Sequence, residues 1–84
     1  MIFLIEYDRR RGKLVTFRSF EDSEREQAQD ARLELELDLH RQKVEREVVI
    51  LEATSEEIIR STHGRYFYNL SELMARFKDA LPAA

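Results

Sequence analysis

The segment over residues 20–43 contains neither glycine nor proline and is rich in Glu, Gln, Arg, Ala and Leu, which favour helix. Its second half alternates leucine with acidic residues from position 33 to 39, which also fits a strand. No β-branched residue occurs before Val44, however, and acidic side chains gather at the start and basic ones at the end, as a helix dipole favours. Ser19 and Ser23 each have an acidic residue three positions on, as in a capping box that starts a helix. We therefore predict one long helix, which the rest of the chain must cover.

The predicted helix carries apolar residues on two sides. At about 100° per residue, one side holds Ala28, Ala31, Leu35 and Leu39, and the nearly opposite side holds Leu33, Leu37 and Val44. A helix that covers a single sheet needs only one apolar stripe, and we expect the first stripe to do so. The second stripe is covered either by the C-terminal segment or by a second copy of the chain. We predict a homodimer, because closed two-fold dimers are the commonest oligomers.

Three segments are predicted strands. Residues 2–7 are almost entirely apolar, which is typical of a central strand covered on both faces. A turn that contains Gly12 leads to residues 14–19, whose alternation of apolar and polar side chains suits an edge strand. Residues 45–53 form the third strand. A right-handed crossover through the long helix would place the third strand beside the first, which gives a sheet of order 2-1-3.

The C-terminal third is predicted to be helical. Thr54 or Ser55 caps a short helix over residues 56–63, which ends near Gly64. Residues 65–69 fit either a continued helix or an edge strand, and Ser71 caps a last helix over residues 72–81. We thus expect the 84 residues to form a single small α+β domain of two-layer ββαβα type. Its three-stranded, mostly antiparallel sheet would carry the long helix on one face, with short C-terminal helices.

Composition excludes several classes of protein. The absence of cysteine rules out disulfides, a thiolate nucleophile and a cysteine-based zinc site, and the two glycines are too few for a phosphate-binding loop. The apolar N-terminal run is too short for a membrane span and lacks the basic start of a signal peptide, so we expect a cytoplasmic protein with no membrane contact. The net charge of −3 argues against a protein that coats nucleic acid. We predict no cofactor.

The most visible charge cluster is the basic hairpin tip, formed by Arg9, Arg10, Arg11 and Lys13. Arginines on a hairpin tip can grip phosphates or enter a nucleic-acid groove. The same charges also protect an edge hairpin from pairing with other sheets, or can contact the acidic helix of a neighbouring molecule. Because the whole chain is acidic, we do not expect nucleic acid to be the main partner.

A second candidate site follows the short helix, where His63, Arg65, Tyr66 and Tyr68 cluster. An imidazole, a guanidinium and phenols near a helix end could bind a small anionic ligand. The alternative is a packing segment in which the tyrosines bury their rings and keep their hydroxyls wet. We predict no catalytic residue and no metal site, since Glu36 and His40 alone have metal-ligand spacing and are explained as an exposed helical pair.

The expected order of elements over residues 1–45, a hairpin followed by a helix, resembles small bacterial antitoxins of the HicB type. The resemblance rests on element order, carries no site residue, and implies a nucleic-acid-associated regulator as an alternative function. The leading prediction is a small, non-enzymatic protein–protein interaction module that acts as a homodimer and contacts an unidentified protein partner. Leu33, Leu37 and Val44 are its predicted interface residues.

Overall fold

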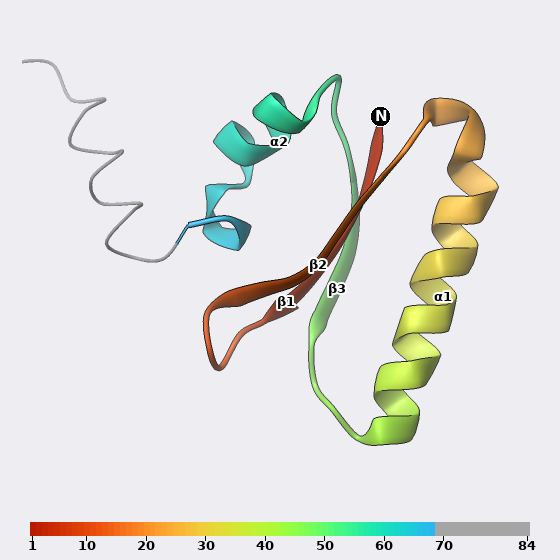
Figure 1. Ribbon diagram of the computed structural model, residues 1–84, viewed down its shortest axis with the longest axis vertical. Helices are drawn as coiled ribbons and strands as arrows, with labels where there is room; N and C mark the ends of the chain where they lie inside the picture. The colour runs from red at the N-terminus through yellow and green to blue at the C-terminus, as the bar shows by residue number, and fades with distance from the viewer. Residues whose placement is uncertain (69–84) are drawn as a thin grey trace, which may run out of the picture.

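The computed structural model describes residues 1–68, and the predicted helix over residues 72–81 lies outside this range. Figure 1 shows the sheet with the long helix beside it on one side and a short helix on the other. In chain order the elements are β1 (Ile2–Asp8), β2 (Lys13–Phe20), the 3-10 turn η1 (Asp22–Glu24), α1 (Arg25–Gln42), β3 (Glu47–Glu52), α2 (Glu56–Thr62) and the 3-10 turn η2 (Gly64–Tyr66).

The sheet has the order β2-β1-β3, and β1 is antiparallel to both neighbours, which confirms the predicted α+β class and strand order. Leu4 at the centre of β1 pairs with Arg18 of β2 and Ile50 of β3. The hairpin turn depends on Gly12, whose φ of 63° is one that side-chain-bearing residues rarely adopt. The central strand is buried almost throughout, as its doubly apolar sequence predicted.

The helix begins later than the sequence suggested. Phe20 still belongs to β2, where it pairs with Ile2, and the predicted caps at Ser19 and Ser23 are replaced by one at Glu21. The Glu21 backbone N–H donates to Glu24 Oε1 at 2.8 Å, which satisfies one of the free donors at a helix start. Residues 19 and 20 stay in the strand because their backbones pair with Phe3 and Ile2 of β1 in the antiparallel hydrogen-bond ladder.

One face of the sheet packs against α1. Its core consists of Ile2, Leu4, Phe20 and Ala28, with the partly buried Ala31, Leu35, Val48 and Ile50 around it. Three of these residues, Ala28, Ala31 and Leu35, come from the helix stripe that was expected to cover the sheet. The helix ends at Lys43, whose left-handed backbone (φ 55°) turns the chain toward β3.

The aromatic residues Phe3, Phe17 and Phe67 pack together on the sheet face that carries α2 and η2. The Phe3 ring stacks on Phe17 at 5.5 Å, and Phe17 meets Phe67 edge-on at 5.2 Å. Ile59 of α2 is fully buried. The segment whose structure was left open by the sequence is not a strand: η2 covers Arg65 and Tyr66, and a turn follows in which Tyr68 N–H donates to the Gly64 carbonyl at 3.0 Å.

Candidate functional site

The outward side of α1 carries two exposed leucines. Leu33 is 56% exposed and Leu37 is 44% exposed, and they lie one turn apart on the same side of the helix. A shallow depression of about 470 Å³ lies beside Leu37, and its rim includes Glu34 and Arg41. The third residue predicted for this interface, Val44, lies beyond the helix end and lines a different cleft together with Leu39.

Within residues 1–68, no segment buries the two leucines. The described part of the C-terminal segment, α2 and η2, lies on the other side of the sheet from α1 (Figure 1). The flank of the leucine pair is charged, with Arg32 and Glu36 joined by an i,i+4 ion pair at 3.0 Å. An apolar centre with a charged rim is the usual composition of a protein–protein contact surface.

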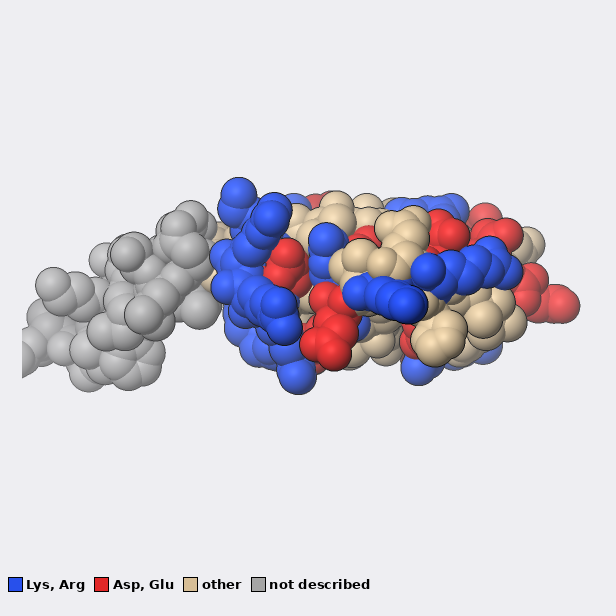
Figure 2. Space-filling view, turned by 90° about the horizontal axis from the view of Figure 1, so that it is seen from below, with Lys and Arg blue, Asp and Glu red and all other residues tan. Residues whose placement is uncertain are grey.

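The hairpin tip is the turn that joins β1 to β2 at one end of the sheet. Lys and Arg side chains gather there (Figure 2). The Asp8 carboxylate organises this turn, because its Oδ1 accepts the backbone N–H groups of Arg10 at 3.0 Å and Arg11 at 3.1 Å. The hydrogen bond from Arg11, helped by the nearby Arg46, outweighs burial and lowers the pKa of Asp8. Arg9 is also engaged, since its Nε lies 3.3 Å from Glu47 Oε2.

Sequence reasoning missed a buried polar cluster behind this tip. Glu6 is buried to 5% exposure, accepts the Thr16 hydroxyl at 2.7 Å and pairs with Arg46 Nη1 at 3.0 Å. Arg46 also reaches Asp8, with its Nε 3.8 Å from Oδ2. A signal did exist, because alternation along β1 places Glu6 and Asp8 on one side of a buried strand, where carboxylates need partners.

Two residues of the predicted ligand patch, Arg65 and Tyr66, form hydrogen bonds with Glu47. Its carboxylate accepts hydrogen bonds from the Tyr66 hydroxyl at 3.1 Å and from Arg65, whose guanidinium lies 4.3 Å from the Tyr66 ring centre. Burial acts to raise the pKa of Glu47, but the hydrogen bonds from Tyr66, Arg65 and Arg9 outweigh it and lower that pKa. Burial together with the Glu47 charge raises the pKa of the Tyr66 phenol.

The other two residues of that patch, His63 and Tyr68, lie on either side of Arg65 and Tyr66 in the chain. His63 stacks on Tyr66 with ring centres 6.5 Å apart, and its Nδ1 lies 2.9 Å from the Thr62 hydroxyl. Tyr68 is half-buried. The structure therefore brings His63, Arg65 and Tyr66 together, but Arg65 and Tyr66 bond to Glu47 and His63 stacks on Tyr66.

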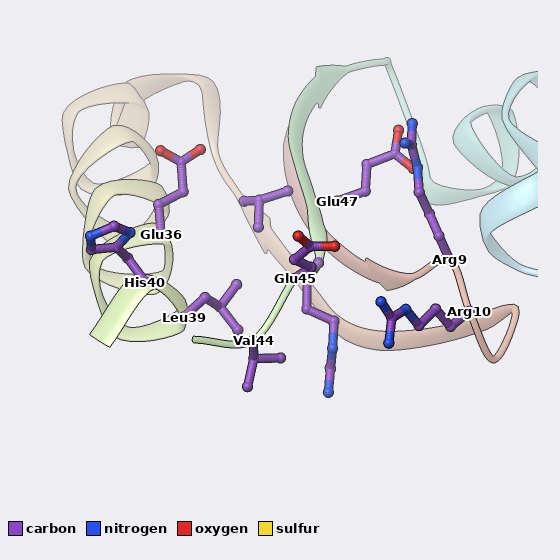
Figure 3. Close-up of a pocket in the computed structure, with 10 residues that line it drawn as sticks. Arg9, Arg10, Glu36, Leu39, His40, Val44, Glu45 and Glu47 are labelled. Carbon is purple, nitrogen blue, oxygen red and sulfur yellow. The ribbon is translucent and has the colours of Figure 1, made fainter. Parts of the chain in front are cut away.

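A cleft of about 600 Å³ opens between the end of α1, the start of β3 and the hairpin tip (Figure 3). Its lining residues are Arg9, Arg10, Glu36, Leu39, His40, Val44, Glu45, Arg46, Glu47 and Val48. In the part of the chain that the structure describes, no three His, Asp or Glu side chains are grouped so as to hold a metal ion. No helix among residues 1–68 has the length and apolar character needed to cross a membrane.

The fold and these surfaces define a small α+β domain with a three-stranded antiparallel sheet and an exposed leucine pair on its long helix. Comparisons with models of protein families, with curated proteins and with solved structures find no match to this chain.

Proposed function

We propose that this chain is a non-enzymatic protein–protein interaction module that forms a homodimer through the outward side of α1. The observation that carries the proposal is the exposure of Leu33 and Leu37, 56% and 44%, on a helix whose opposite side already covers the sheet. Because each leucine is only about half exposed, burying what remains of it contributes roughly 1 kcal/mol, about half the value for a fully exposed leucine.

Charge complementarity favours a second copy as the occupant. In an antiparallel two-fold pairing of α1 helices centred between the two leucines, Leu33 lies opposite Leu37 of the partner subunit. The same symmetry brings Asp30, near the start of the helix, close to Arg41 of the partner subunit. Asp30 and Arg41 lie eleven positions apart in the sequence, which is about three helical turns, and so share one side of α1. A two-fold dimer would contain this ion pair twice.

The mass in solution tests the proposal. Light scattering coupled to size exclusion, over a wide range of concentration, is expected to give twice the mass of one chain for the unmodified protein. Leu33→Glu combined with Leu37→Glu is expected to give one chain mass with an unchanged circular dichroism spectrum. Ile58→Glu is the matched control, because Ile58 is also 44% exposed but lies on α2. A monomer at every concentration would overturn the proposed dimer.

A charge swap tests the geometry of the dimer without touching the leucines. Asp30→Arg alone places like charges opposite each other and is expected to weaken the dimer, whereas Asp30→Arg with Arg41→Asp restores the opposite charges and the dimer. Both side chains are exposed, so the fold of either variant is expected to survive. If the double variant dissociates as readily as the single one, the helices do not pair antiparallel.

Two expectations from the sequence remain predictions. A cytoplasmic location rests on the composition of the chain alone. Nucleic-acid binding by the hairpin tip has less support in the structure, because Arg9 pairs with Glu47 and Arg11 lies 3.9 Å from Asp8. Such binding would weaken steeply with added salt and with alanine at Arg10 and Lys13.

A further inference from the structure

Among residues 1–68, β3 lies at an edge of the sheet, and one side of its backbone has no neighbouring strand there. The Met1 amino group donates to the Ala53 carbonyl at 2.9 Å, and the Ala53 N–H donates to the Met1 carbonyl at 3.1 Å. This hydrogen-bonded pair shows which residues of β3 bond to β1. Hydrogen-bonded and non-hydrogen-bonded pairs alternate along an antiparallel ladder. The odd-numbered residues of β3 therefore bond to β1, and the backbone groups of Val48, Ile50 and Glu52 point outward.

These outward backbone groups are open to another strand. The turns and helix caps of residues 1–68 make no hydrogen bond to Val48, Ile50 or Glu52. An unpaired strand edge is a template for a further strand unless charge, proline or a bulge protects it. The centre of β3, Val48 to Leu51, has none of these features.

The opposite edge of the sheet differs from β3. The register between β1 and β2 shifts between Glu6 and Tyr7, which marks a bulge in this pair of strands. Lys13 and Arg18 also place charges along β2. A bulge and basic side chains both discourage pairing with another strand. The structure therefore leaves β3 as the edge that is open to strand addition.

A groove runs beside the open edge. The cleft of about 600 Å³ is bounded by Leu39 and His40 of α1 on one side and by Arg10 of the hairpin on the other, with Val44 and Val48 lining it (Figure 3). The side chain of Val48 lies on the α1 side of the sheet, as do those of alternate residues along β3. An added strand would place every second side chain in this groove.

The charges of the groove indicate what it accepts. Arg9, Arg46 and Glu36 are neutralised by Glu47, Glu6 and Arg32, respectively. The Arg10 guanidinium has no ion pair within residues 1–68, and it extends from the hairpin toward β3 (Figure 3). The His40 imidazole adds a second donor on the facing helix, and of the three carboxylates in the lining only that of Glu45 has no ion pair within residues 1–68. A carboxylate at this end would gain a charge-assisted hydrogen bond.

We propose that the open edge of β3 binds an extended, acidic segment of a partner protein as a fourth strand. Its aliphatic side chains face Leu39 and Val48, and an acidic side chain lies beside Arg10. Backbone hydrogen bonds supply the affinity, and the groove supplies the specificity. The site is distinct from Leu33 and Leu37, which lie on the outward side of α1. A protein that proves monomeric could therefore still bind the segment at β3, and a protein that does not bind it could still form the dimer.

Peptide binding measured by fluorescence anisotropy tests strand addition on the full chain. The probe is a labelled peptide of alternating threonine and valine that ends in two aspartates. We expect saturable binding by this peptide and at least about tenfold weaker binding when the aspartates are replaced by lysines, because like charges then meet at Arg10. A third probe has N-methyl groups on alternate amides, which removes the backbone donors that a fourth strand needs, and is expected not to bind.

Variants of the protein test the two halves of the site separately. Val48→Pro removes an outward N–H and leaves the ladder with β1 intact, as proline on an edge strand does, so the peptide is expected to lose binding while the fold persists. Arg10→Glu is expected to weaken binding of the acidic peptide about tenfold. Lys13→Glu is the matched control, because Lys13 lies on the same hairpin but does not line the cleft.

Three results would overturn strand addition by an acidic segment. The first is no binding of the aspartate peptide to the folded protein at any accessible concentration. The second is equal binding of the N-methylated and unmodified probes, which would show that side chains alone are recognised. The third is a fall in solution mass caused by Val48→Pro, since the edge would then be occupied by a second copy of the chain.

Discussion

The Tyr66 hydroxyl donates to Glu47 Oε1 at 3.1 Å and ties η2 to the first residue of β3, 19 positions earlier in the chain. Tyr7 packs against the same tyrosine, with ring centres 5.4 Å apart and the planes nearly perpendicular. This contact joins the C-terminal turn to the sheet through one polar and one aromatic interaction.

Tyr66→Phe removes the hydroxyl and keeps the ring. The Glu47 carboxylate then loses one of its donors, and we expect the free energy of unfolding to fall by about 2 kcal/mol, the usual size for a hydrogen bond to a charged group. Urea denaturation of the two proteins measures the difference. An unchanged midpoint would show that Arg65 and Arg9 satisfy Glu47 by themselves.

Glu47 is expected to make stability depend on pH. Its pKa is lowered in the folded protein, so its contribution is fully present above the ordinary glutamate value of about 4.3 and is lost as the pH falls through the folded value. Glu47→Gln is therefore expected to flatten the acid side of the stability curve, measured as urea midpoints over a pH series. Glu57→Gln, at an exposed carboxylate of α2, is the control and is expected to keep the curve of the unmodified protein.

Arg46→Ala leaves two carboxylates without their shared cation. Glu6 is buried, and removing one partner of a buried ion pair costs about 3 kcal/mol. We expect the loss to appear in the unfolding free energy at neutral pH, measured by urea denaturation. Arg11→Ala is the comparison, since Arg11 is exposed and lies 3.9 Å from Asp8. Equal losses for the two variants would contradict the central role of Arg46.

Neighbouring isoleucines on α2 allow a matched test of how this helix is held. Ile59 is fully buried and Ile58 is 44% exposed. Ile59→Ala is expected to lower stability by about 2–4 kcal/mol, and Ile58→Ala by less than about 0.5 kcal/mol. Thermal unfolding followed by circular dichroism distinguishes them. Similar effects would mean that α2 does not pack through Ile59.

Lys43→Gly is expected to stabilise the fold. Lys43 has a φ of 55°, a left-handed conformation that costs a side-chain-bearing residue roughly 1–2 kcal/mol. Glycine is the usual residue at this position after a helix, and we expect the melting temperature to rise. A lower melting temperature would indicate that the lysine side chain contributes contacts that outweigh the strain.

The sequence was sufficient to predict the sheet. Residues 2–5 are apolar without interruption, which marks a strand with two covered faces, and the crossover rule then places β3 beside it. The start of α1 was misplaced because local capping patterns at Ser19 and Ser23 compete with strand pairing, which only the register of β1 and β2 reveals.

The candidate surfaces were predicted unevenly. The exposure of Leu33 and Leu37 follows from helical periodicity, since only one side of α1 can face the sheet. Val44 was assigned to the same stripe, but the left-handed turn at Lys43 takes it off the helix. The pairing of Glu47 with Tyr66 depends on where η2 docks, and no local pattern encodes that tertiary contact.

The central position of β1 has a consequence for folding kinetics. Its pairing with β2 closes a short loop, but its pairing with β3 joins Tyr7 to Glu47 across most of the described chain. Until that second pairing forms, one whole edge of the most apolar strand stays exposed, and such an edge recruits other unfinished chains. Rapid formation of α1, which separates β2 from β3, shortens this interval by bringing β3 back alongside the hairpin.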